Sequence, residues 1–175
     1  MPLPQTILDS HIWQQTLAGR SADDNSEARE RLRSAFTSFR ERAGLLAGEI
    51  RRDLPQLTLH DQNHLDALWE TAATILGPDY ALTPAEGFVL GGAFLLHDLG
   101  MAVPSFDGGI EGLKADPRWA DLVTYEYQTN LDRTPSDDEI RNPDEEIGRR
   151  VLLNLLQQTH AENAERLAFL DWVWR

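Results

Sequence analysis

An adjacent His-Asp pair, His97-Asp98, ends an unusually apolar stretch of the chain. The ten residues from Gly87 to Leu96 carry no charged side chain, and a helix that is apolar on every side is normally buried. An ionised carboxylate in such a place costs several kcal/mol unless a cation or good hydrogen bonds compensate it. A divalent metal would compensate it, so this pair is a candidate metal site.

Two further histidines precede this pair. His60 and His64 lie four residues apart, about one helical turn, so both imidazoles can share a helix face. Two predicted helices therefore offer imidazole and carboxylate groups. Neutral imidazole and carboxylate suit Mn²⁺, Fe²⁺, Zn²⁺, Co²⁺ or Mg²⁺, and the residue types do not select one of these metals. The alternative is a buried histidine that bonds a carbonyl, followed by an aspartate that caps the next turn.

These residues resemble the HD superfamily of metal-dependent phosphohydrolases. Residues 58–64, with His60 and His64, are similar to the Thr-x-His-x-x-x-His opening of several HD branches, and residues 96–100 are similar to their second motif. Residues 159–162, Thr-His-Ala-Glu, are similar to a later element in HD domains that accompany chaperone-like GHKL-type ATPases. The resemblance covers about residue 57 to the C-terminus. It implies an all-α, HD-domain-like compact bundle of about seven or eight helices.

The resemblance also implies a metal held by His64, His97, Asp98 and a distal aspartate. Asp171 is a plausible distal ligand, and a surface position is the alternative interpretation of that residue. Other candidates for the distal ligand are Asp121, Asp132 and a residue beyond Arg175.

Other polar residues near these motifs could act on the substrate. His60 could contact a phosphate or give a proton to a leaving group, or it could be a polar residue at a helix start. Asp61 and Asp66 are expected at the N-terminus and on the solvent face of the same helix, although Asp61 could instead orient a ligand imidazole. His160 could contact metal or phosphate, or it could occupy an exposed helix start.

An arginine pair, Arg149-Arg150, is a candidate contact for a substrate phosphate. The ordinary alternative for such a pair is a solvated helix face. The chain carries 16 basic and 29 acidic residues, a formal charge of −13, so a duplex nucleic acid would meet a repulsive average field. The expected partner is therefore a small anionic substrate, such as a nucleotide, whose phosphate a metal and a few arginines could neutralise.

The composition fits a soluble protein of the cytoplasm. The sequence has no cysteine, which excludes disulfides and thiolate metal sites. It shows no membrane-spanning stretch and no secretory signal.

The hydrophobic pattern predicts helices at residues 6–17, 26–54, 60–76, 84–96, 118–128 and 142–156, and a last helix from Thr159. Thr83, Pro84 and Glu86 form a strong helix start, with an N-cap, a first-turn proline and a capping-box glutamate. We expect the helix after His64 to dock through Leu68, Ala72 and Ile75. Residues 104–112 read as a glycine-rich connection, and residues 130–142 as a surface loop or short helix.

The domain prediction is an N-terminal helical extension, residues 1–56, packed on an HD-like domain, residues 57–175, that could continue further. Six large apolar residues fall within residues 167–174, so we expect this tail to pack on an apolar surface.

Three functions are consistent with these motifs. The first is metal-dependent hydrolysis of a nucleotide or other small phosphoester, by the HD module of a larger ATPase-linked or defence-related protein. The second is an HD domain that binds metal or nucleotide without catalysis, as a regulatory module fused to or associated with an ATPase domain. The third is a di-iron oxygenase, which additional histidine ligands would favour.

Overall fold

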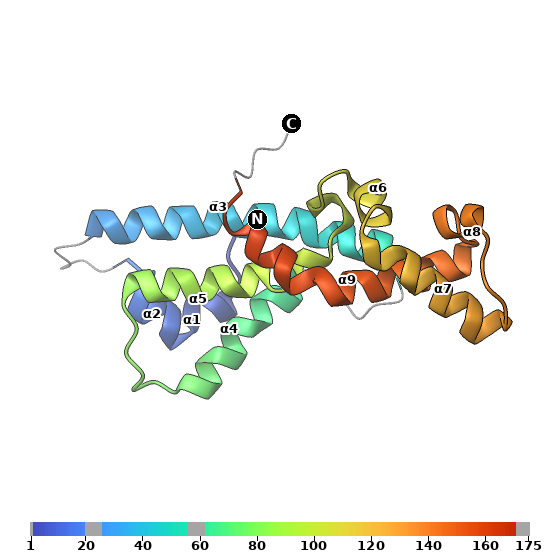
Figure 1. The fold of residues 1–175 in the computed structure, drawn as a ribbon. Helices are drawn as coiled ribbons and strands as arrows, with labels where there is room; N and C mark the ends of the chain where they lie inside the picture. Colours follow the sequence, from blue (N-terminus) through green and yellow to red (C-terminus); the bar gives the residue numbers. More distant parts are fainter. Residues whose placement is uncertain (1, 20–25, 56–61, 171–175) are drawn as a thin grey trace.

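The computed structural model describes residues 2–19, 26–55 and 62–170. This part is all-α, as predicted, and its elements comprise nine α-helices, two 3-10 helices and no strand. Figure 1 shows a long helix, α3 (Ser26–Asp53), and the other α-helices in two groups. The first group is α1 (Gln5–Asp9), α2 (His11–Thr16), α4 (Gln62–Leu76) and α5 (Pro84–Leu96). The second group is α6 (Gly109–Lys114), α7 (Pro117–Leu131), α8 (Asp137–Arg141) and α9 (Glu145–Leu167).

The helix predicted over residues 6–17 is interrupted at Ser10. The backbone of Ser10 is extended, and its hydroxyl accepts a hydrogen bond from the Trp13 amide at 3.2 Å. In a continuous helix the Trp13 amide would donate to a backbone carbonyl, and here the Ser10 hydroxyl accepts in place of that carbonyl. The segment therefore forms α1 and α2 in place of one helix.

Aromatic side chains from three of these helices and α3 form the centre of the first group. Trp69 lies edge-on to Phe36, Trp13 and Phe94, with ring centroids 5.4 to 6.1 Å apart. A Cβ at Gly91 would lie 2.5 Å from the Trp69 ring, so the backbone of α5 can approach this cluster only without a side chain there.

The buried faces of α4 and α5 differ from the predicted ones. On α4, Leu65 and Trp69 are buried, whereas Ile75 is 76% exposed, so the predicted docking stripe is wrong at its far end. On α5, Gly87, Gly91 and Leu95 are buried while Val89 is exposed. The uncharged helix α5 is therefore not buried on every side, which is possible because apolar atoms form a large part of the surface of folded proteins.

The start of α5 is confirmed. Thr83 caps the helix, and the Thr83 amide donates a hydrogen bond to Oε2 of Glu86 at 2.8 Å. The glycine-rich connection predicted at residues 104–112 contains more structure than expected, because it includes the end of the second of two 3-10 helices and the start of α6. The 3-10 helices are η1 (Leu99–Met101) and η2 (Val103–Ser105).

The two C-terminal helices expected at residues 142–156 and from Thr159 are one helix, α9. Thr159 is buried, and its hydroxyl donates to the Leu155 carbonyl at 2.8 Å. No proline or glycine separates the two predicted segments, and a threonine can bond back within a helix without ending it. The helix start expected at Thr159 is therefore wrong.

The C-terminal tail packs only in part where the structure describes it. Leu167 is buried at the end of α9, but Phe169 is 84% exposed and Leu170 is also exposed. The prediction of a docked tail is wrong for these two residues, and residues 171–175 lie outside the described part. None of the helices in the described ranges is long and apolar enough to cross a membrane.

Residues before and after position 57 share one hydrophobic core. Its buried members include Trp13, Phe36 and Ile50 from the first segment and Trp69 and Leu155 from the second. The α3 helix contacts α4, α5, η1 and η2. The N-terminal helices thus complete the core on which the candidate site depends.

Candidate metal centre

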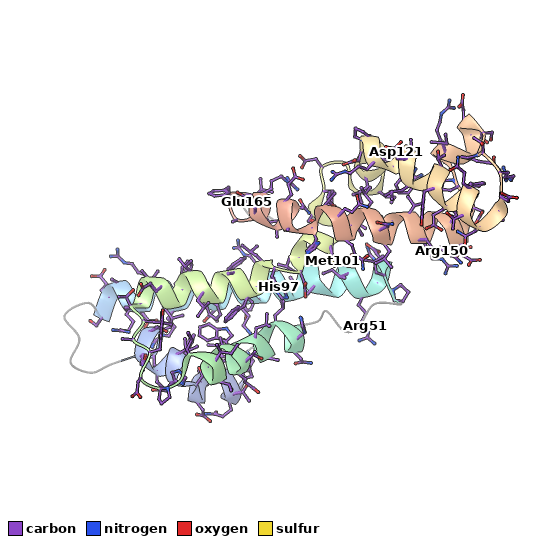
Figure 2. All side chains as sticks on the ribbon, turned by 60° about the horizontal axis from the view of Figure 1, so that its bottom comes forward. Arg51, His97, Met101, Asp121, Arg150 and Glu165 are labelled. Atoms are coloured by element: carbon purple, nitrogen blue, oxygen red, sulfur yellow. The ribbon has the colours of Figure 1, made fainter. Side chains whose placement is uncertain are left out.

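The three residues of the predicted site come from the start of α4 and the end of α5. His64 lies in the first turn of α4, and His97 is the C-cap residue of α5. Asp98 follows with φ −97° and ψ −15° and precedes η1. Since α4 packs on α5, the two helices bring the side chains together near the middle of the molecule, where Figure 2 shows His97.

The structure brings His64, His97 and Asp98 together. Oδ2 of Asp98 lies 3.1 Å from Nε2 of His64 and 2.9 Å from Nε2 of His97. The imidazole centroids are 5.5 Å apart, and one ligand atom from each residue lies within 4.8 Å of the others. Both histidine side chains are 39% exposed and the Asp98 side chain is 14% exposed, so the cluster is open to solvent on the histidine side.

Asp98 changes the acidity of its neighbour. The hydrogen bond that the His97 ring donates to the Asp98 carboxylate raises the pKa of His97 above its ordinary value, against the opposing effect of burial. Nδ1 of His97 lies 2.8 Å from the Phe94 carbonyl, which only accepts, so Nδ1 carries a proton and Nε2 is the nitrogen directed at Asp98. A metal ligand must be deprotonated, and this arrangement leaves Nε2 of the neutral ring available.

The donor set fits a divalent transition metal. Two imidazole nitrogens and a carboxylate oxygen converge, and His97 makes the carbonyl contact typical of a metal-binding histidine. His64, His97 and Asp98 are therefore the residues that would hold the ion.

Sequence reasoning placed Asp66 on the solvent face of α4, and this is wrong. Asp66 is buried, as is Arg40 of α3, and Nε of Arg40 donates to Oδ1 of Asp66 at 2.7 Å. A second bond joins the same guanidinium to Oδ2 of Asp66. This two-point pair fixes α4 against α3 two residues after His64. No local signal distinguishes such an aspartate from an exposed one, because its partner lies 26 positions away.

Several predicted site residues lie outside the described part of the chain. These are His60, Asp61 and Asp171, so their assignments stay predictions. Of the other candidates for the distal ligand, Asp121 is exposed on α7 and Asp132 is the C-cap residue of that helix. The structure does not bring either of them into the cluster.

His160 lies in the interior of α9, not at a helix start. Its Nδ1 lies 2.7 Å from the Gln157 carbonyl of the same helix, and it is not part of the cluster formed by His64, His97 and Asp98. The described residues therefore supply no additional histidine ligand of the kind that would favour a di-iron centre.

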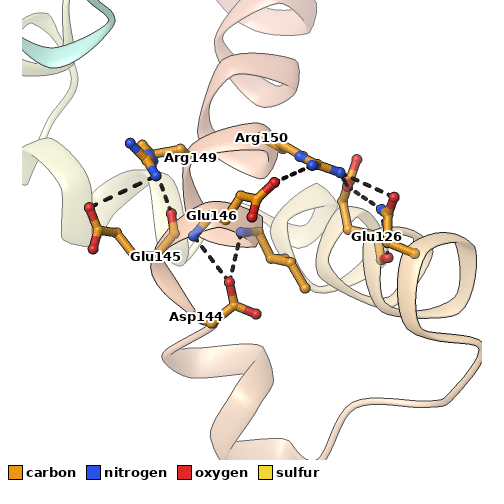
Figure 3. A network of polar contacts seen from close by, with 8 residues as sticks. Glu126, Asp144, Glu145, Glu146, Arg149 and Arg150 are labelled. Carbon is orange, nitrogen blue, oxygen red and sulfur yellow. Dashed lines mark hydrogen bonds and ion pairs between the residues drawn. The ribbon is translucent and has the colours of Figure 1, made fainter.

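Arg149 and Arg150 lie on α9 and form ion pairs with neighbouring acidic residues (Figure 3). Nε of Arg149 donates to the Glu145 carbonyl at 3.3 Å. Arg150 pairs with Glu146 and lies 3.7 Å from Glu126 of α7. Figure 2 shows Arg150 well separated from His97 along α9. The structure thus gives this pair the solvated, ion-paired surroundings of the alternative interpretation and does not join it to the cluster.

The comparisons with known proteins identify the family. No curated protein and no solved structure matches the chain. The family model HD-CE matches residues 54–174, which include His64, His97 and Asp98. This match spans well over half of the 175 residues. The chain therefore belongs to the HD-CE family, and its domain is of the HD type.

Proposed function

We propose that this protein is a metal-dependent phosphohydrolase that acts on a nucleotide or another small phosphoester. The observation that carries the proposal is the convergence of His64, His97 and Asp98 on one point. Membership of an HD-type family supports it, because the HD superfamily that these motifs resemble contains such enzymes.

Each residue of the cluster has a distinct role in this proposal. A bound divalent ion would supply a Lewis acid for the phosphoryl oxygen and would lower the pKa of an attacking water. His64 and His97 would hold the ion through imidazole nitrogens, and Asp98 would supply the negative charge that favours a divalent cation. The exposed side of the two imidazoles leaves room for substrate and water to approach.

The charge of the chain restricts the substrate. With a formal charge of −13, the average field repels long polyanions, whereas a small phosphoester meets mainly the local charge at the cluster. We therefore propose a small anionic substrate, not a duplex nucleic acid.

Hydrolysis by the full chain tests this proposal. The wild-type protein should release phosphate or a nucleoside from nucleotides or a generic phosphoester when Mn²⁺ is added, and not after chelation. His97→Ala and Asp98→Ala should each abolish the metal-dependent turnover. Asp138→Asn is a matched control, since Asp138 is an exposed carboxylate in the first turn of α8. The proposal would be refuted if both site variants had the same turnover as the wild type, or if a chelator did not change the turnover.

A regulatory module that binds metal without hydrolysis is a second candidate. The observation that favours it is that three donors form the cluster among the described residues, fewer than the four expected from the resemblance. Calorimetric titration with Mn²⁺ separates the two candidates. Binding that His97→Ala and Asp98→Ala remove, with no turnover of any phosphoester tested, would favour the regulatory module.

A further inference from the structure

The turn that follows Asp98 has little support from its own backbone. Within η1, the Met101 amide donates to the Asp98 carbonyl at 2.9 Å and the Ala102 amide donates to the Leu99 carbonyl at 3.1 Å. Leu99, Gly100 and Met101 are buried, and η2 follows after one residue. Because short 3-10 helices have poor internal hydrogen bonds, tertiary contacts must hold this turn in place.

Asn163 of α9 supplies such a contact. This side chain is 5% exposed, and its Nδ2 donates to the Gly100 carbonyl at 3.1 Å and to Oγ of Ser105 at 2.5 Å. The Ser105 hydroxyl in turn donates to the Ala102 carbonyl at 2.6 Å. One buried amide therefore joins η1 and η2 to the same point on α9.

The partners of Asn163 determine which way its amide faces. Nε and Nη2 of Arg166 donate to Oδ1 of Asn163 at 3.1 and 3.0 Å, and Arg166 also donates to the Ser105 carbonyl. A guanidinium only donates and the Gly100 carbonyl only accepts. The nitrogen must therefore face Gly100 and the oxygen must face Arg166, so an aspartate could replace only half of these bonds.

The backbone of η1 also lies directly against α9. A Cβ at Gly100 would lie 1.9 Å from the His160 carbonyl oxygen and 2.9 Å from the Ala164 amide nitrogen. Since no side chain lies between the two backbones, a shift of α9 would directly move Gly100, which is two residues after Asp98.

We propose that Asn163 is a positioning residue for the candidate metal centre. It fixes the backbone of residues 98–100, and so directs Oδ2 of Asp98 towards the imidazoles of His64 and His97. This inference rests on the proposed function. A ligand constellation must be held to within about 0.5 Å, and loss of an outer-shell partner typically weakens metal binding about 10- to 100-fold.

Asn163→Asp tests this role because it keeps the oxygen that Arg166 binds and removes the donor to Gly100. We expect the Kd for Mn²⁺, measured by calorimetry on the full chain, to rise by about 10- to 100-fold. In the metal-free protein, amide hydrogen exchange of Met101 and Ala102, whose bonds form η1, should become faster. The thermal midpoint should fall as well, since a buried carboxylate oxygen then faces the Gly100 carbonyl, while the contact with Arg166 remains.

Thr159→Val is the matched control. Thr159 is buried one turn earlier on α9, and its hydroxyl bonds within that helix. This variant loses a buried hydrogen bond that lies within α9 and keeps the bonds of Asn163 to Gly100 and Ser105, so its Mn²⁺ affinity and the exchange of Met101 should equal those of the wild type. If Asn163→Asp does not fold, Asn163→Ser takes its place, because a serine hydroxyl is too short to reach Gly100.

Wild-type Mn²⁺ affinity and unchanged exchange of Met101 in the Asn163 variant would overturn the positioning role, whatever the protein hydrolyses. Failure of the wild type to bind Mn²⁺ would refute the proposed metal centre instead. In that case the exchange of Met101 and Ala102 still decides whether Asn163 holds the turn: faster exchange supports the role and unchanged exchange overturns it.

Discussion

A methyl group at Gly100 should be strongly destabilising. The Cβ of Gly100→Ala would lie 1.9 Å from the His160 carbonyl oxygen and 2.7 Å from the carbon of that carbonyl. Carbon and oxygen atoms in close contact normally stay about 3.3 Å apart or more. The backbones of η1 and α9 would therefore have to separate by more than about 1 Å, and neither is a flexible side chain that can swing away.

The magnitude follows from the cost of overpacking a core. Extra methyl groups in well-packed interiors typically cost about 1–3 kcal/mol, and we expect the upper end because backbone atoms form the obstacle. For a chain of this size, 1 kcal/mol changes Tm by about 2–4 °C. Gly100→Ala should thus lower Tm by roughly 6–12 °C, and it should also weaken Mn²⁺ binding, since Asp98 lies two residues away.

Thermal unfolding followed by circular dichroism measures this effect. Gly48→Ala in α3 is the matched control, because a Cβ there would meet nothing within 4 Å. Inside a helix this change should stabilise the protein by about 0.5–1 kcal/mol. A Tm for Gly100→Ala equal to that of the wild type would show that η1 and α9 are not in direct backbone contact and would refute the reasoning.

Three further predictions concern charges around the site. Asp66→Ala leaves the buried guanidinium of Arg40 without its carboxylate and should lower the free energy of unfolding, measured in urea, by about 3–5 kcal/mol. The double variant Arg40→Met, Asp66→Leu should recover much of this loss. An Asp66→Ala variant as stable as the wild type would contradict the pairing. Asp98 raises the pKa of His97. His97 should therefore stabilise the metal-free protein fully below about pH 6.5, and this stabilisation should be lost as the pH rises through the raised pKa. The stability difference between wild type and His97→Gln should therefore shrink on going from pH 6 to pH 9, and a difference independent of pH would contradict it. Protonation of His97 also competes with metal, so Mn²⁺ affinity should fall as pH is lowered through that pKa.

Local patterns were sufficient for much of the helical structure. The capping box at Thr83 and Glu86 predicted the start of α5 because its hydrogen bonds join residues three apart. The order of His64, His97 and Asp98 predicted their convergence because two packed helices carry them. Local signals gave wrong predictions where a serine or threonine hydroxyl can bond the backbone both at a helix start and inside a helix. Ser10 ends α1 by capping α2, while Thr159 bonds back within an unbroken α9.

The sequence by itself determined the helical class, since periodicity and capping are local, and its motifs, through their resemblance to HD domains, determined which three residues meet at the site. Only the tertiary structure decided that Asp66 is buried against Arg40 and that Asn163 holds the turn after Asp98. Those contacts join residues 26 and 63 positions apart. The burial of a polar side chain is stabilising only when its distant partner is in place, and no local pattern records where that partner will lie.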